Sequence, residues 1–485
     1  MKNRFHILLA CLFLKITSID LGGQARPIDT FSYFQNYKEF TNYAEDYYMK
    51  HDKGRGSGYK QYMRKRIFLD PKFGFKPQVK NFTALDNEAF TEVKRSIKHD
   101  LSRSTHGGWE DMGPHNYTVN DVWSQGGIGR VSCVAFHPTN PQIIWVGTPV
   151  GGLWKTIDGG TTWSCITNNF TSLGVCQIAV NYNNPDIIYI LTGGGYAGYS
   201  NCIGVMKTED GGLTWKNIRN HNLSEGYVGT TMVMHPTNPD ILYYGILDHT
   251  GLTRTVYYTN SGGNNWNSLI IYESIYDIKF KTDDNSVFIV TLSRVLKYVP
   301  STNTLTDINY PMSNVNSWKR IAFAPSNPNT VYILHGGGGL SGQFAGLFKS
   351  TDGGNNFTLM SNSPNILGWD SGGNDMGNQA YIHLAITVNP NNENEVFVAG
   401  INCWKSVDGG ATWNRKTYWN RSFSPYVHAD FYSVVFNGNR LYACNDGGIY
   451  YSDDYANSWT EITAGLGVMT FYNFNIESTL KSGIF

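Results

Sequence analysis

The sequence of 485 residues has few charged side chains, no net charge and no apolar run long enough to span a membrane. Only 16% of the residues are charged while 41% are hydrophobic, which excludes an intrinsically disordered chain. Lys+Arg and Asp+Glu both number 38, so nucleic acid is not expected as a partner. Because no segment approaches roughly 18 uninterrupted apolar residues, we also expect no transmembrane helix.

Cysteine is scarce, with seven residues and no CxxC pair, so a structural zinc site is not expected. Cys11 lies in the first 25 residues, which have the pattern of a secretory signal peptide: Lys2 and Arg4 precede the apolar stretch 7–14, and Ala25 offers a cleavage point. We therefore expect a secreted or cell-surface protein. The remaining cysteines permit disulfide bonds, although a chain this long does not need them: Cys133, Cys165, Cys176, Cys202, Cys403 and Cys444.

Glycine and aromatic residues are abundant, with 52 Gly and 14% Phe, Trp and Tyr, which favours short strands joined by tight turns. A repeated motif supports this expectation. Thr156-Ile-Asp-Gly-Gly-Thr-Thr-Trp163, here called the box, has close copies at 208–215 and 406–413. Weaker copies lie at 259–266, 350–357 and 452–459, and His137-Pro-Thr-Asn-Pro141 and its copies form a second turn motif upstream of most boxes.

Each repeat contains four short strands, and seven repeats fit the chain. We therefore predict an all-β fold, a seven-bladed β-propeller of four-stranded antiparallel blades, over residues 109–470. Residues 471–485 are expected to be a ring-closing strand or the start of a further, truncated blade. The seven units are approximately 128–166, 175–218, 228–269, 275–308, 319–360, 381–416 and 431–462.

The box carboxylates and indoles are predicted to be structural, because a fold device is needed once per blade and a catalytic group only once. The carboxylate is expected to accept hydrogen bonds from its own turn, and the Trp to pack between sheets. The residues concerned are Asp158, Trp163, Asp210, Trp215, Asp352, Asp408, Trp413, Asp454 and Trp459.

Residues 26–108 are predicted to form a basic helical leader. Residues 26–104 contain 16 Lys+Arg against 10 Asp+Glu, so the neutral total conceals a basic leader and an acidic propeller. Aromatic residues at Phe34, Tyr37, Phe40, Tyr43 and Tyr47 recur at spacings of three and four, which line one helix face. A second helix is expected over 86–98. We favour a leader that packs on the propeller over a separate element that docks on an anionic surface.

Ligands are expected on the face opposite to the repeated turns, because the variable loops lie there. These loops combine aromatic rings, His and Arg, which suits a glycan or a peptide. The candidate ligand-binding residues are Arg130, Tyr196, Tyr199, His249, Arg254, His335, Trp369, Trp419, Arg421 and His428.

Paired carboxylates of a glycoside hydrolase are the alternative on this face, with Asp370, Asp375, Asp430 and Asp446 as weak catalytic candidates. His428 and Asp430 are expected on the same side of a strand, and with Asp446 they can form a hard-cation or acid/base site. We prefer a polar pair satisfied by neighbouring loop amides, and we predict no metal ion and no cofactor.

The box resembles the Asp-box, or BNR, repeat of sialidases, sortilin/Vps10 propellers and xyloglucanases. Gly151-Gly-Leu-Trp-Lys-Thr156, His428-Ala-Asp430 and Asn445-Asp-Gly-Gly-Ile-Tyr450 look more closely like exported sortilin-like BNR proteins of bacteria with type IX secretion. This resemblance implies a binding module, expected to be a monomer, for a glycan or a peptide or protein ligand. It argues against catalysis in one respect: where xyloglucanases place a catalytic Asp before the Gly-Gly of the first blade, this chain has Thr148-Pro149-Val150.

Overall fold

The computed structural model describes residues 37–51, positions 53, 59, 62 and 63, and residues 127–468 with short gaps. The chain divides into two compact units, Met1–Lys80 and Asn81–Phe485. The predicted signal peptide, the second leader helix and segment 471–485 lie outside the described residues. The gaps within 127–468 are 169, 171–173, 196–199, 201, 222–226, 249–253, 313–315, 338–342 and 378.

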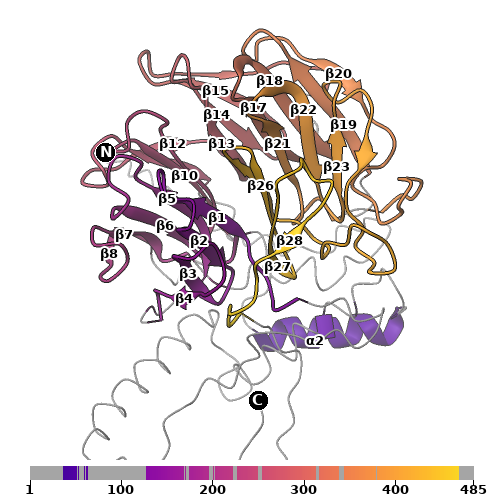
Figure 1. Cartoon of the computed structure of the whole chain (residues 1–485), viewed down its shortest axis with the longest axis horizontal. Coiled ribbons are helices and arrows are strands. Elements are labelled where there is room, and N and C mark those ends of the chain that lie inside the picture. Colours follow the sequence, from indigo (N-terminus) through magenta and orange to yellow (C-terminus); the bar gives the residue numbers. More distant parts are fainter. Residues whose placement is uncertain are drawn as a thin grey trace, which may run out of the picture. The chain divides into compact units, whose positions relative to one another are not determined.

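Seven antiparallel sheets make up the second unit, each formed by four consecutive strands and called a blade here (Figure 1). Blade 1 contains β1 (Cys133–Phe136), β2 (Ile144–Thr148), β3 (Gly152–Thr156) and β4 (Ser164–Cys165); blade 2, β5 (Val175–Val180), β6 (Ile188–Thr192), β7 (Gly204–Thr208) and β8 (Lys216–Asn220); blade 3, β9 (Tyr227–Met234), β10 (Leu242–Asp248), β11 (Thr255–Thr259) and β12 (Asn267–Ile270); blade 4, β13 (Ile275–Phe280), β14 (Val287–Thr291), β15 (Val295–Val299) and β16 (Thr304–Asp307). Blade 5 contains β17 (Trp318–Ala324), β18 (Asn327–Gly336), β19 (Phe344–Ser350) and β20 (Thr358–Ser361); blade 6, β21 (Ala385–Asn389), β22 (Asn392–Ala399), β23 (Cys403–Ser406) and β24 (Asn414–Arg415); blade 7, β25 (Ser433–Asn437), β26 (Arg440–Asn445), β27 (Gly448–Ser452) and β28 (Thr460–Glu461).

The blades close into a ring. The first strand of each blade contacts the first strand of the next, and β25 contacts β1. The seven-bladed, four-stranded prediction is therefore confirmed, and each predicted unit matches one blade to within two residues where a blade extends beyond it. Ring closure uses complete blades 1 and 7 in the described part of the chain, where Val131 N–H donates to Asn445 O at 3.0 Å.

Burial follows the position of a strand within its blade. Every residue of β2, β6 and β14 is buried, whereas β16 is exposed throughout. Apolar and β-branched runs such as Val287-Phe-Ile-Val290 suit strands covered on both faces. The six cysteines in the described part of the chain are free, so packing rather than disulfide bonding holds these blades.

The two repeated turn motifs lie on one face of the ring, which we call the box face. Gly159 N–H of a box donates to Gln142 O of the upstream turn at 2.9 Å, and Gly211 N–H donates to Asp186 O at 3.0 Å. Box turns join third and fourth strands, and upstream turns join first and second strands. The opposite face, the loop face, therefore carries the connections between second and third strands and between blades.

Each box is an internally hydrogen-bonded turn. Asp158 Oδ1 accepts hydrogen bonds from Thr156 Oγ1 at 2.7 Å and from Thr162 N–H at 2.9 Å. Gly160 has a φ of 98°, and a Cβ there would lie 2.8 Å from Ile462 of blade 7, so the turn needs glycine. The same pattern of bonds to the carboxylate recurs at Asp210, Asp352, Asp408 and Asp454.

Box Trp residues reach the preceding blade. Trp163 Nε1–H donates to Ile462 O of blade 7 at 2.9 Å, and Trp413 Nε1–H donates to Ser361 Oγ of blade 5 at 2.9 Å. Trp215 differs, because its Nε1–H donates within its own box to Gly212 O, and the buried Nε1–H of Trp459 has no hydrogen-bond partner among the described residues. The box thus links neighbouring blades, including the first and the last.

The first unit contains one described helix, α2 (Tyr37–Lys50). Of the predicted aromatic face, Phe40 and Tyr47 are buried and Tyr43 is half-buried, while the side chains of residues 34 and 37 lie outside the part that the structure describes; Tyr48 is buried as well. Phe40 and Tyr48 contact the ring of Tyr62. No helix among the described residues is long and apolar enough to cross a membrane.

Candidate functional site

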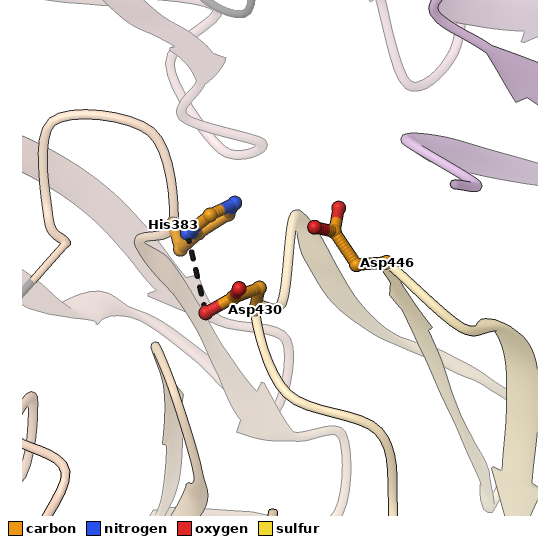
Figure 2. A group of neighbouring side chains, drawn as sticks. All are labelled: His383, Asp430 and Asp446. Atoms are coloured by element: carbon orange, nitrogen blue, oxygen red, sulfur yellow. Dashed lines mark ion pairs between the residues drawn. The ribbon is translucent and has the colours of Figure 1, made fainter. Parts of the chain in front are cut away.

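Three connections of the loop face bring polar side chains together around one point. His383 lies between β20 and β21, Asp430 between β24 and β25, and Asp446 between β26 and β27. His383 and Asp430 lie just before the first strands β21 and β25, and Asp446 directly follows β26. The blades therefore hold the three side chains in place. Figure 2 shows their side chains meeting from separate segments.

The ligating atoms of the three groups all lie within 4.8 Å of one another. The shortest contact joins His383 Nδ1 and Asp430 Oδ1 at 3.6 Å, the dashed line in Figure 2. This separation is too long for a hydrogen bond. The His383 side chain is 4% exposed, whereas those of Asp430 and Asp446 are 20% and 25% exposed. The cluster is therefore largely shielded, with both carboxylates at its open side.

Asp446 is the ionised member of the cluster. Arg130 donates to it twice, from Nε at 2.7 Å and from Nη2 at 3.2 Å, and Tyr432 Oη–H donates at 3.0 Å. Burial alone would raise the pKa of Asp446, but the Arg130 charge and these hydrogen bonds hold it below its usual value. Arg130 precedes β1 and Asp446 follows β26, so this ion pair also links blades 1 and 7.

Asp430 has the opposite environment. Burial, and then repulsion from Asp446, raise its pKa to about 7, and Arg130 only partly offsets them. Its Oδ1 is buried and has no hydrogen-bond partner among the described residues. Its backbone has a φ of 72°, a left-handed conformation that is uncommon for a residue other than glycine. The two carboxyl groups therefore differ in charge state near neutral pH.

His383 is a neutral imidazole. Burial lowers its pKa to about 3, so between pH 3 and 7 neither His383 nor Asp430 is mainly charged and their contact is not an ion pair. Neither ring nitrogen has a hydrogen-bond partner in the described structure. The Tyr432 ring packs edge-on against the imidazole at 4.8 Å between centroids. Leaving such a buried polar group unpaired costs roughly 1–3 kcal/mol.

His428 is not the histidine of this cluster. Its Nδ1–H donates to Ala429 O at 3.1 Å, and residues 428–430 lie between β24 and β25, so the expectation that His428 and Asp430 share a strand is wrong. The expectation that loop amides satisfy Asp430 also fails for Oδ1. The missed residue, His383, has one signal in the sequence: like Arg130 and Asp430, it is a polar residue just before the first strand of a blade.

His335 is corrected from a ligand contact to a core residue. It lies within β18, is fully buried, and its ring bonds to Tyr310 Oη at 2.7 Å and Ser317 Oγ at 3.0 Å. β18 runs through His335 to Gly336, so His335 belongs to a strand and not to the loop that follows. A ligand at the surface therefore does not reach His335.

Asp370 and Asp375 are engaged in their own loop rather than in the His383 cluster. Asp375 Oδ2 accepts from Trp369 N–H at 2.7 Å, and Asp370 Oδ2 accepts from Asn374 N–H at 3.0 Å. Their geometry is that of turn-stabilising carboxylates. Of the four catalytic candidates, the structure thus brings together only Asp430 and Asp446.

The connections β20–β21 and β24–β25, which contain His383 and Asp430, also carry an aromatic patch. It consists of Trp369, Tyr418, Trp419 and Phe423. Trp419 Nε1–H donates to Trp369 O at 2.9 Å, which joins the two loops. Tyr418 and Phe423 are stacked at 5.1 Å. Trp369 and Phe423 are 36% and 54% exposed, so the patch presents rings to solvent.

The remaining candidates are dispersed. Arg421 lies over the Tyr426 ring at 4.6 Å, and Arg254 Nη1 donates to Tyr272 O at 3.3 Å. Tyr196, Tyr199 and His249 lie outside the described residues.

No family model matches the chain. It is 22% identical over 361 residues to a xyloglucanase of Paenibacillus sp, a match covering 63% of this chain and 33% of that protein. It is 20% identical over 369 residues to xyloglucanase Xgh74A of Acetivibrio thermocellus, covering 62% and 40%. The structure of the GH74 xyloglucanase from Xanthomonas campestris aligns with a TM-score of 0.51 at 15% identity, covering 70% of this chain and 55% of that one.

These matches identify distant xyloglucanase relatives and a shared propeller fold. The chain spans only about a third to two-fifths of the length of these curated relatives.

Proposed function

We propose that the loop face binds a polysaccharide through the aromatic patch. The observation that carries this proposal is the exposure of Trp369 and Phe423 on the two connections that also carry His383 and Asp430. Aromatic faces suit the C–H faces of sugar rings, and nearby polar groups can orient the hydroxyls. The distant xyloglucanase relatives support a glycan as the ligand class.

Titration calorimetry with xyloglucan oligosaccharides tests this proposal. The double variant Trp369→Ala, Trp419→Ala is expected to weaken binding at least tenfold, equivalent to about 1.4 kcal/mol. Tyr272→Ala is the matched control, because Tyr272 is a highly exposed aromatic residue on another interblade connection. Binding that is unchanged in the double variant, or equally reduced in the control, argues against the patch as the glycan site.

Glycoside hydrolysis is the second candidate, favoured by the different charge states of Asp430 and Asp446. A carboxyl that stays protonated up to about pH 7 beside an ionised carboxylate is the pattern of an acid and its partner. Oxygen atoms within 4.8 Å of one another are too close for the roughly 6.5–9.5 Å of an inverting pair and are nearer to the roughly 5–5.5 Å of a retaining pair. If hydrolysis is detected and Asp430→Asn with Asp446→Asn retains it, the assignment to this pair is wrong.

Export and a sortilin-like binding role remain proposals based on the sequence. Binding of a peptide or protein ligand and a monomeric state are likewise proposals based on the sequence. Peptide mass spectrometry of secreted protein is expected to find Arg26 at the mature N-terminus, and a retained segment 1–25 would contradict the signal peptide.

A further inference from the structure

We propose that His383, Asp430 and Asp446 bind a divalent transition-metal cation, with Zn²⁺ as the first choice. This inference is independent of glycan binding. It differs from the sequence-based expectation, which considered His428 with Asp430 and Asp446 and predicted no metal ion. Three connections of the ring contribute one ligand atom each, and these atoms lie within 4.8 Å of one another (Figure 2). A three-ligand site leaves a coordination position open for water or a ligand oxygen.

The unpartnered imidazole is the independent observation that points to a cation. The side chain of His383 is only 4% exposed, and both of its ring nitrogens lack a hydrogen-bond partner among the described residues. The facing oxygen, Asp430 Oδ1, lacks one too. A cation between them would satisfy Nδ1 of His383 and Oδ1 of Asp430, and a neutral imidazole is the form that binds metal.

The distance between these two atoms fits shared coordination better than a hydrogen bond. Ligands about 2.1 Å from a tetrahedral Zn²⁺ are about 3.4 Å apart, close to the 3.6 Å between His383 Nδ1 and Asp430 Oδ1. Asp446 lies within 4.8 Å of the other two, so it has to approach by at most about 1.4 Å to reach the same spacing. This shift is within the range of a carboxylate rotation.

Asp446 keeps capacity for a cation despite its other partners. Arg130 Nε and Tyr432 Oη–H occupy Oδ1, while Oδ2 accepts only the 3.2 Å bond from Arg130 Nη2 among the described hydrogen bonds. One lone pair of Oδ2 is left for a metal. Arg130 and Tyr432 would then orient the ligand from outside, as in other metal sites. The Arg130 charge also opposes the cation, so we expect micromolar rather than nanomolar affinity.

The donor set favours a transition metal over Ca²⁺ or Mg²⁺. Calcium takes six to eight oxygen ligands, and magnesium prefers oxygen and retains its waters. An imidazole nitrogen with two carboxylates suits Zn²⁺ and neighbouring first-row cations.

Titration of the chelator-treated full-length chain with Zn²⁺, and in parallel with Ca²⁺, tests the proposal. One Zn²⁺ per chain is expected, with Ca²⁺ at least tenfold weaker. His383→Gln and Asp430→Asn should each weaken Zn²⁺ binding at least tenfold and abolish the rise in Tm that Zn²⁺ produces in the parent chain. His428→Gln is the matched control, because this partly buried neighbour lies outside the cluster and should bind Zn²⁺ like the parent.

Absence of stoichiometric Zn²⁺ binding by the parent chain overturns the proposal, as does equal loss in His428→Gln. Circular dichroism checks that each variant folds. If His383→Gln does not fold, the absorption spectrum of bound Co²⁺ is compared between the folded parent and the folded His428→Gln chain. The same tetrahedral spectrum in both chains supports the site. Loss of the spectrum in His428→Gln overturns it. Oligosaccharide binding measured with and without Zn²⁺ keeps this outcome separate from that of the aromatic patch.

Discussion

The two faces of the propeller treat their carboxylates in opposite ways. On the box face, Asp158 accepts hydrogen bonds from its own turn, and these bonds lower its pKa to about 2. On the loop face, Asp430 has a buried oxygen without a hydrogen-bond partner, and burial raises its pKa to about 7. The box device recurs around the ring, whereas the His383 cluster occurs once in the described structure. A carboxylate that recurs in each repeat and is fully hydrogen-bonded indicates a structural role. A single buried carboxyl without a hydrogen-bond partner indicates a functional site.

The largest effect is expected at the seam between blades 1 and 7. Trp163→Ala removes a buried indole that belongs to the same core cluster as Tyr442 and Leu466 and donates a hydrogen bond to Ile462 O. Loss of such a side chain costs about 3–5 kcal/mol, and thermal unfolding measures it. Trp163→Phe should lose far less.

Glycan affinity of the folded Trp163→Ala chain should match that of the parent below its Tm. A selective loss of binding at unchanged Tm would contradict the division between the two faces.

A smaller effect is expected from Asp158→Ala, and it should depend on pH. The folded pKa of Asp158 is lowered from 3.8 to about 2, so its contribution to stability is present above about pH 4 and is lost as pH falls toward 2. The Tm of the variant should therefore lie a few degrees below that of the parent at pH 6, and the gap should narrow on acidification. Thermal scans from pH 6 to pH 2.5 measure the gap. A gap that widens at low pH, or a loss of glycan binding, would show that Asp158 is more than a turn residue.

The fold was predictable because its determinants are local. The box contains its own hydrogen-bond acceptor, its turn glycines and its interblade Trp within eight residues, as in 156–163. Strand burial then follows from short apolar runs such as Val287–Val290. Each of these signals lies within one blade, so reading one repeat predicts the others.

The site was only partly predictable because its contacts cross between blades. Asp430 and Asp446 were found from their place on the loop face, but pairing His428 with Asp430 assumed strand alternation. Residues 428–430 lie between β24 and β25 rather than in a strand, and Asp430 has a φ of 72°, so strand alternation does not apply to these two side chains. His383 is 47 positions before Asp430 in the sequence, and only the closed ring brings them together. His335 was misplaced because β18 runs further than its glycine-rich end suggested.

The smallest effect is expected from the exposed apolar side chains of the box turns, and it tests the comparison most directly. Ile157, Leu213 and Val407 occupy variable positions of three boxes and are highly exposed. If the box face is scaffold alone, Ile157→Ser, Leu213→Ser and Val407→Ser together should change stability by no more than about 0.5 kcal/mol per site. Neither oligosaccharide nor Zn²⁺ titration should change. These side chains bury little area in the folded chain, so a lost interaction would have to be with another molecule. A loss of ligand binding in this triple variant, at unchanged Tm, would therefore place a binding surface on the box face and end its assignment as scaffold.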